Sequence, residues 1–205
     1  MPGVKAATPL AWFGGVYKDD KLPFAQFATD PQIIMQVFDE FTLPDEQRPA
    51  VGRALGRIPQ GLFIVTAAFE DRRAAMLASW VQQASFEPPM ISVAICKGRH
   101  IMPLISDSHV FGLCQVGKTK DDKVILRKFA GKMPAGEDPY LGFELVEPTV
   151  TGVPILANAM AYLECHMTTH LDIDGDHDLF IARVVGGGGP GGDPQVHLRD
   201  DGCKY

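Results

Sequence analysis

The sequence has no surplus of positive charge and no long hydrophobic run. It contains 19 Lys and Arg against 25 Asp and Glu, which gives a net charge of −6. Proteins that bind nucleic acid through its phosphates need a basic surplus, so this balance argues against DNA or RNA as a partner. No segment approaches the roughly 18 apolar residues that a membrane-spanning helix requires, and the N-terminus lacks the pattern of a signal peptide. We therefore expect a soluble, cytoplasmic protein with no membrane partner.

Cysteine pairs are also missing. The 4 cysteines are widely spaced and form no C-x-x-C motif, which argues against a disulfide framework or a zinc knuckle. Cys165 and His166 are neighbours on a predicted strand and would point to opposite faces, so they do not converge on a metal. The acidic run from Asp172 to Asp176 has His177 and Arg183 where a calcium loop needs Gly and Glu. We predict no metal site and buried, free thiols.

What is present indicates a globular domain with an N-terminal extension. Of the 205 residues, 46% are hydrophobic and 21% charged, which excludes a disordered or fibrous chain. Residues 1–30 mix Gly, Pro and aromatic residues without a clear period and predict an irregular arm. Apolar spacing predicts amphipathic helices over residues 31–41 and from about Thr42 to Ile58. We expect residues 1–50 to form an arm and helices that pack on the domain of residues 51–205.

The remainder of the chain alternates between short β-rich runs and turns. Apolar or charged residues at helical spacing occur only in residues 101–106 and 120–129 of this part of the sequence. About seven strands with so few helices favour an antiparallel β-barrel or sandwich with peripheral helices, because a parallel sheet needs a helical crossover between most strands. The predicted strands are residues 62–69, 74–81, 90–96, 110–116, 143–147, 160–170 and 178–185.

A glycine-rich run at Gly186–Gly191 formally matches the dinucleotide motif G-x-G-x-x-G after a predicted strand. Its context does not fit, because Pro190 stands where the following helix should begin and too little chain remains for a ribose-binding acid. We predict a flexible hairpin or tail loop here instead.

Four segments of the sequence carry a family resemblance. They are ALGRIPQG at residues 54–61, MLASWVQQASFEPP at 76–89, KGRH at 97–100 and GDH at 175–177. Together they resemble the flavin reductase-like, FMN-binding split-barrel family, and residues 78–89 are similar to the flavin reductase domain of cyanobacterial flavodiiron proteins. The resemblance extends over residues 50–185. It implies a mainly β fold with peripheral helices, namely a split β-barrel of antiparallel Greek-key strands, and a homodimer.

The same resemblance implies a flavin reductase that transfers a hydride from NADH or NADPH to FMN. An alternative is a non-catalytic FMN electron-transfer protein that serves a protein electron acceptor. A third reading is a split barrel that binds another planar ligand, such as pyridoxal phosphate or haem. The choice between NADH and NADPH, the physiological acceptor, and the distinction between a tightly held and a diffusing flavin stay open.

Individual residues receive roles from this resemblance and from their chemistry. Lys97, Arg99 and the start of the following helix offer positive charge and N–H groups to a terminal phosphate. His177 of the GDH segment is expected on the nicotinamide side of the site and is the candidate catalytic residue. Small residues permit close approach of a flat ring to the chain. The predicted FMN-binding residues are Leu77, Ala78, Ser79, Trp80, Gln82, Ala84, Ser85, Phe86, Lys97, Gly98, Arg99 and His100.

Overall fold

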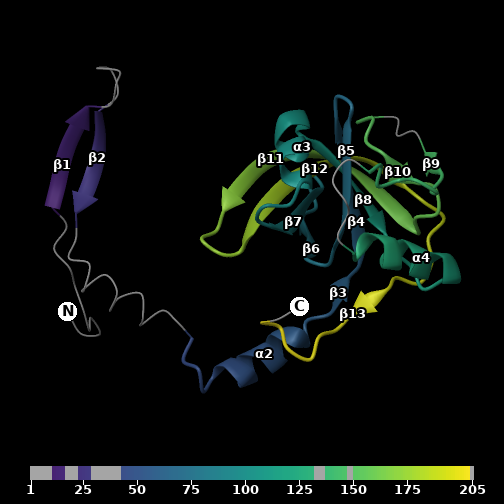
Figure 1. The fold of residues 1–205 in the computed structure, drawn as a ribbon, viewed down its shortest axis with the longest axis horizontal. Helices are drawn as coiled ribbons and strands as arrows, with labels where there is room; N and C mark the ends of the chain where they lie inside the picture. The colour runs from purple at the N-terminus through teal and green to yellow at the C-terminus, as the bar shows by residue number, and fades with distance from the viewer. Residues whose placement is uncertain (1–10, 17–22, 29–42, 132–136, 147–149, 204–205) are drawn as a thin grey trace. The chain divides into compact units, whose positions relative to one another are not determined.

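The computed structural model describes residues 11–16, 23–28, 43–131, 137–146 and 150–203 (Figure 1). The chain divides into two compact units, residues 1–55 with 201–205 and residues 56–200. No helix within the described ranges combines the length and the apolar character that a bilayer crossing requires.

The first unit contains a hairpin where the sequence predicted an irregular arm. Strands β1 (Ala11–Val16) and β2 (Pro23–Ala28) pair antiparallel, with Ala11 opposite Ala28. The prediction was wrong because glycines and aromatics interrupt the two-residue alternation by which a strand is recognised. Helix α2 (Arg48–Gly56) confirms the second predicted helix over a shorter range, and the helix predicted at residues 31–41 lies outside the described residues.

The second unit is built on a seven-stranded sheet with the order β5-β4-β8-β11-β12-β7-β6. All of its neighbouring strands pair antiparallel. The strands are β4 (Phe63–Phe69), β5 (Arg72–Ala78), β6 (Val81–Ser85), β7 (Met90–Cys96), β8 (Val110–Gln115), β11 (Ala161–Asp172) and β12 (His177–Gly188). Short strand pairs flank the sheet: β3 (Gln60–Gly61) with β13 (Val196–His197), and β9 (Leu145–Val146) with β10 (Ile155–Leu156).

The sheet is curled, and one connection shows why. Strands β5 and β6 stand at opposite ends of the strand order, yet only Ser79 and Trp80 separate them in the sequence. The three Cα–Cα steps from Ala78 to Val81 span only about 10 Å. The sheet must therefore bend until its two edges approach each other, although no ladder pairs β5 with β6 in the described part of the chain. The predicted split barrel is confirmed, and its split lies at Ser79–Trp80.

Two apolar clusters stabilise this unit. The inner cluster receives side chains from all seven strands and from α3 (Ile101–Ser108), which packs on it through Leu104 and Ile105. The outer cluster lies under α4 (Lys120–Phe129), which contributes Ile125 and Phe129. In Figure 1, α3 and α4 lie on different sides of the curled sheet. Both clusters use the alternation of strand side chains: on β4, Val65 joins the inner cluster and Ile64 the outer one.

The predicted elements of this unit match the structure closely in most places. Strand β7 and helix α4 have the predicted bounds. The strand predicted at residues 74–81 instead ends at Ala78, and β6 was not predicted. The predicted loop at Gly186–Gly188 is wrong as well, because β12 continues through it and pairs with β11. A Cβ atom on Gly187 would lie 2.8 Å from the Tyr162 carbonyl oxygen, so glycine is needed there for close strand approach, not for a turn.

Candidate functional site

The predicted ring-binding segment lies where the barrel is split. Ala78 is the last residue of β5 and is buried, while Trp80 precedes β6 and is half-buried. The Trp80 carbonyl accepts a hydrogen bond from the Ala94 N–H of β7 at 3.0 Å, which fixes the Trp80 backbone against the sheet. Strand β7 lies between β6 and β12, and Cys96 of β7 stands opposite His177, so the Trp80 and His177 side chains meet beside the end of β7.

His177 is buried against Trp80. The two ring centroids are 4.5 Å apart with an angle of 46° between the planes, and the His177 side chain is only 4% exposed. On β12, His177 points to the side opposite Phe180 and Ala182, which belong to the inner cluster, so this contact lies on the outer face of the barrel. The predicted strand begins at residue 178, whereas β12 begins one residue earlier, at His177 itself.

Asp176 orients the His177 ring. The Nδ1 atom of His177 is 2.7 Å from Oδ1 of Asp176, and this hydrogen bond is the main reason why the pKa of Asp176 is lowered. An ionised carboxylate only accepts, so Nδ1 carries the proton and donates it. Asp176 thereby sets the tautomer of the imidazole and the direction in which its ring points.

Arg199 covers the indole as well. Its guanidinium carbon lies 5.3 Å from the centre of the Trp80 ring, within the range of a cation–π interaction. Arg199 follows β13, and its N–H donates to the Gly56 carbonyl at 3.0 Å. Sequence reasoning missed Arg199, because no local pattern connects a residue of the C-terminal segment with a tryptophan far away in the sequence.

Lys97 is held by carboxylates. Its Nζ lies 2.7 Å from Asp172 and 3.6 Å from Asp178, and the hydrogen bond with Asp172 is the main cause of the raised pKa of Lys97. Asp178 also contacts His170 at 2.8 Å, and the His170 ring stacks on Phe180 with 4.3 Å between the ring centroids. The Lys97 ammonium is thus engaged at the turn end of the β11–β12 hairpin.

Arg99 is differently placed. It is exposed in the turn between β7 and α3, directly after Gly98, whose φ is +79°. Within the described ranges the Arg99 guanidinium is in no ion pair. The start of α3 carries no side-chain cap on its N-cap residue His100. Few backbone donors remain there, however, since Met102 N–H bonds to the Arg99 carbonyl at 3.1 Å and Pro103 has no N–H. The guanidinium of Arg99 is therefore the strongest anion-binding group of this turn.

The remaining predicted residues lie on β6 and the turn that follows it. Gln82 and Ala84 are exposed, Ser85 is half-buried, and the Phe86 side chain is 87% exposed. An irregularity in the ladder between Gln83 and Ser85 leaves Ala84 without a register partner on β7. As the edge strand, β6 presents backbone N–H and C=O groups that a ligand with both donors and acceptors can use.

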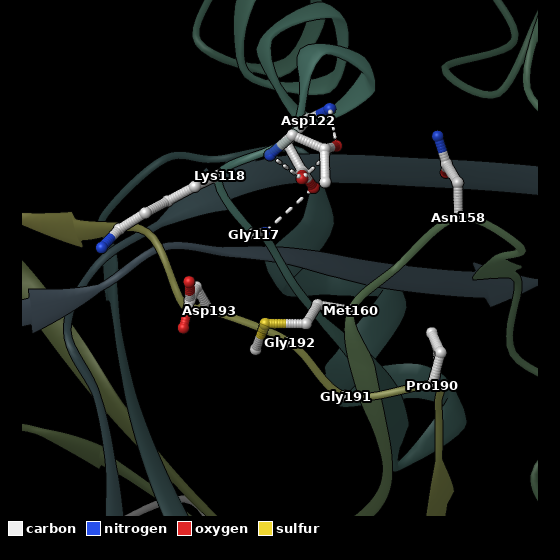
Figure 2. A pocket seen from close by; sticks show the side chains of 10 residues that line it. Gly117, Lys118, Asp122, Asn158, Met160, Pro190, Gly191, Gly192 and Asp193 are labelled. Carbon is white, nitrogen blue, oxygen red and sulfur yellow. Dashed lines mark hydrogen bonds between the residues drawn. The ribbon is translucent and has the colours of Figure 1, made fainter.

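A separate cavity of about 340 Å³ lies near the start of α4 (Figure 2). Asp122 faces it, but the Asp122 carboxylate is occupied by Gly117 N–H at 2.9 Å and by the N–H and hydroxyl of Thr119 at 2.8 and 2.6 Å. These bonds form the N-terminal cap of α4. None of the predicted flavin-binding residues lines this cavity, which is bounded by Gly117, Lys118, Thr119, Asp122, Asn158, Met160, Pro190, Gly191, Gly192 and Asp193.

Comparison with known proteins shows the family to which the chain belongs. Residues 55–203 match the model of the flavin reductase like domain. The chain belongs to the flavin reductase-like domain family. It is 40% identical over 139 residues to putative diflavin flavoprotein A 2 of Synechocystis sp.. The aligned residues are 68% of this chain and 24% of the relative. Diflavin flavoprotein A 1 of the same organism is 36% identical over 137 residues, 66% of this chain and 23% of the relative. The chain thus spans about a quarter of the length of these curated relatives.

Solved structures of flavin reductases share the fold. The NADH:FAD oxidoreductase SgcE6 of Streptomyces globisporus C-1027 superposes with a TM-score of 0.67 at 22% identity, over 77% of this chain and 92% of that chain. The styrene monooxygenase flavin reductase of Pseudomonas putida S12 gives a TM-score of 0.59 at 25% identity, over 71% and 90% of the two chains. This flavin reductase-like domain therefore has the split-barrel fold. Residues 76–89, which carried much of the sequence resemblance, lie at the split of the barrel.

Proposed function

We propose that this domain binds FMN at the split of the barrel and transfers a hydride to it from NADH or NADPH. The observation that carries the proposal is the convergence of Trp80 and His177 on the outer face of the barrel, next to the edge strand β6. The matched family and the flavoprotein relatives support a flavin as the ligand.

The residues at the split fit a flavin. Ala78 and Ser79 are small enough to let a flat ring approach the backbone, and the β6 edge supplies N–H and C=O groups for a ring that both donates and accepts. Leu77 and Trp80 add apolar surface. A bound flavin supplies the electron chemistry, and the protein positions the two rings and keeps water away.

The phosphate of FMN is assigned to Arg99. A guanidinium binds phosphate through a two-pronged hydrogen bond, and the Arg99 side chain is not already committed to a carboxylate within the described residues. Lys97 adds positive potential near this turn, but its ammonium is shared with Asp172 and Asp178. Gly98 and His100 shape the turn that presents Arg99.

His177 orients the nicotinamide in this proposal. Its Nδ1–H is held by Asp176, which fixes the orientation of the imidazole that a nicotinamide ring would meet. His177 moves no proton in a hydride transfer between the two rings and acts by positioning.

The experiment is reduction of the purified protein under anaerobic conditions. Protein loaded with FMN should lose its oxidised flavin absorbance on addition of NADH or NADPH, and FAD and riboflavin serve as comparison ligands. The second candidate, an electron-transfer protein without nicotinamide activity, is favoured by the 4% exposure of His177. It predicts rapid reduction by a chemical reductant and none by either nicotinamide nucleotide.

We also propose a homodimer. The family resemblance implies this assembly, and the second unit exposes large apolar side chains, among them Phe86, Leu141 and Ile173, which contact with a second subunit would remove from water.

A further inference from the structure

The residue that the proposed function assigns to the nicotinamide is covered in the structure. Only 4% of the His177 side chain is exposed, and the Trp80 indole lies 4.5 Å from its ring. A nicotinamide ring is about as wide as the six-membered ring of the indole, so the two cannot occupy the same face of the imidazole together. One of the aromatic side chains must move before a nucleotide reaches His177.

The contacts of the two residues indicate which one moves. His177 is the first residue of β12, its ring is held by Asp176, and it is almost fully buried. Trp80 lies outside the regular strands and is only half-buried. Its backbone is fixed by the hydrogen bond from Ala94, so any movement is a rotation of the indole about its side-chain bonds.

Arg199 holds the indole in the covering position. Its guanidinium carbon lies 5.3 Å from the centre of the Trp80 ring. The hydrogen bond from Arg199 N–H to the Gly56 carbonyl fixes the backbone from which the Arg199 side chain extends to the indole. Arg199 and His177 thus both stabilise the orientation of Trp80 that keeps His177 covered.

We propose that Trp80 controls nicotinamide access: its side chain competes with the nicotinamide ring for His177, and Arg199 sets how strongly it competes. This inference rests on the proposed function. Nucleotide binds only to molecules in which the indole has rotated away, so the apparent Kd equals the intrinsic Kd divided by the open fraction. One aromatic contact and one cation–π contact make the closed form about tenfold more populated than the open one, a ratio that corresponds to about 1.4 kcal/mol.

The first test is stopped-flow reduction of FMN-loaded protein over a range of NADH and NADPH concentrations. In protein saturated with FMN, Trp80→Ala should lower the apparent Kd for the nucleotide about tenfold. Trp80→Phe keeps a ring over His177 and should stay within about threefold of the wild type, whereas Arg199→Gln should lower the Kd about threefold. Gln83→Ala is the matched control, because the exposed side chain of this β6 residue donates to the Ser85 carbonyl at 3.3 Å and the proposed function gives it no role.

The second test does not depend on turnover. The chain has 2 tryptophans, so Trp12→Phe leaves Trp80 as the only one. In this variant, with FMN bound, addition of oxidised NAD or NADP should change the Trp80 emission with the same Kd that calorimetry gives. The emission changes because the indole leaves the imidazole and the guanidinium.

The outcomes separate the two proposals. If the wild type is reduced but both Trp80→Ala and Arg199→Gln bind nucleotide with an unchanged Kd, access control by Trp80 is wrong and the reductase assignment stands. Nucleotide binding without a change in Trp80 emission contradicts the inference as well. If Trp80→Ala does not fold, Trp80→Phe and Arg199→Gln carry the kinetic test. If neither the wild type nor any variant binds or accepts a nicotinamide nucleotide, the reductase assignment fails and the inference fails with it.

Discussion

Replacement of Arg99 by alanine should weaken FMN binding while leaving riboflavin binding unchanged. Riboflavin lacks the phosphate and shares the ring, so the ratio of the two affinities isolates the phosphate contact. Loss of a charge-assisted hydrogen bond costs about 1.5–3 kcal/mol, and the exposure of Arg99 places the expected cost near the lower end, at roughly tenfold in Kd. The preference for FMN should also shrink as the salt concentration rises, since an exposed charge is screened.

The neighbouring cation provides the matched comparison. Lys97 is already engaged by Asp172 at 2.7 Å and by Asp178 at 3.6 Å, so Lys97→Ala should change the FMN to riboflavin ratio by less than about threefold. Both variants are measured by titration of flavin fluorescence. An unchanged ratio in Arg99→Ala, or a larger loss in Lys97→Ala than in Arg99→Ala, would refute the assignment of the phosphate to Arg99.

Three further predictions concern stability, the nicotinamide and assembly. Asp122→Ala removes three hydrogen bonds that cap α4 and should lower the free energy of unfolding by about 2–4 kcal/mol, read as a lower Tm. Burial alone would raise the pKa of Asp122, but the bonds from Thr119 and Gly117 outweigh it and lower the pKa. The stabilising effect of ionised Asp122 is therefore present above its unfolded pKa of about 4 and is lost as the pH falls through its folded pKa. The Tm difference between the wild type and Asp122→Ala should narrow in acid. His177→Asn should lower kcat/KM for the nicotinamide nucleotide about 10–100-fold with FMN affinity nearly intact; an unchanged rate of flavin reduction would leave His177 a purely structural residue. Sedimentation of the FMN-loaded protein should show a dimer at micromolar concentration, and a fully loaded monomer would contradict that proposal.

The fold was largely predictable because its strands and helices carry local signals. Met90–Cys96 alternates buried and half-buried side chains, and Lys120–Phe129 has the spacing of a charged helix, so the sequence predicts both elements with their observed bounds. Strand β6 was missed because three of its residues are exposed and its sequence follows β5 almost directly. The glycines of Gly186–Gly188 predict a loop, because the close approach of Tyr162 that requires glycine there is a contact across the sheet that local sequence does not reveal.

The candidate site was only partly predictable, because its contacts join segments that are distant in the sequence. The resemblance identified Trp80 and His177 separately, but their contact depends on the register of β6, β7 and β12. The pairing of Lys97 with Asp172 depends on how the β11–β12 hairpin folds back over the end of β7. Arg199 lies in a segment with no chemical motif, and its role follows only from its position over the Trp80 ring.

The central claim is that this domain passes electrons from a nicotinamide nucleotide to a flavin held at the split of the barrel. It is tested most directly by mixing the FMN-loaded wild-type protein with NADH or NADPH in an anaerobic stopped-flow instrument. The account predicts loss of the oxidised flavin absorbance at a rate that saturates with nucleotide concentration. A flavin that stays oxidised with both nucleotides, but is reduced at once by dithionite, would contradict the account and favour an electron carrier.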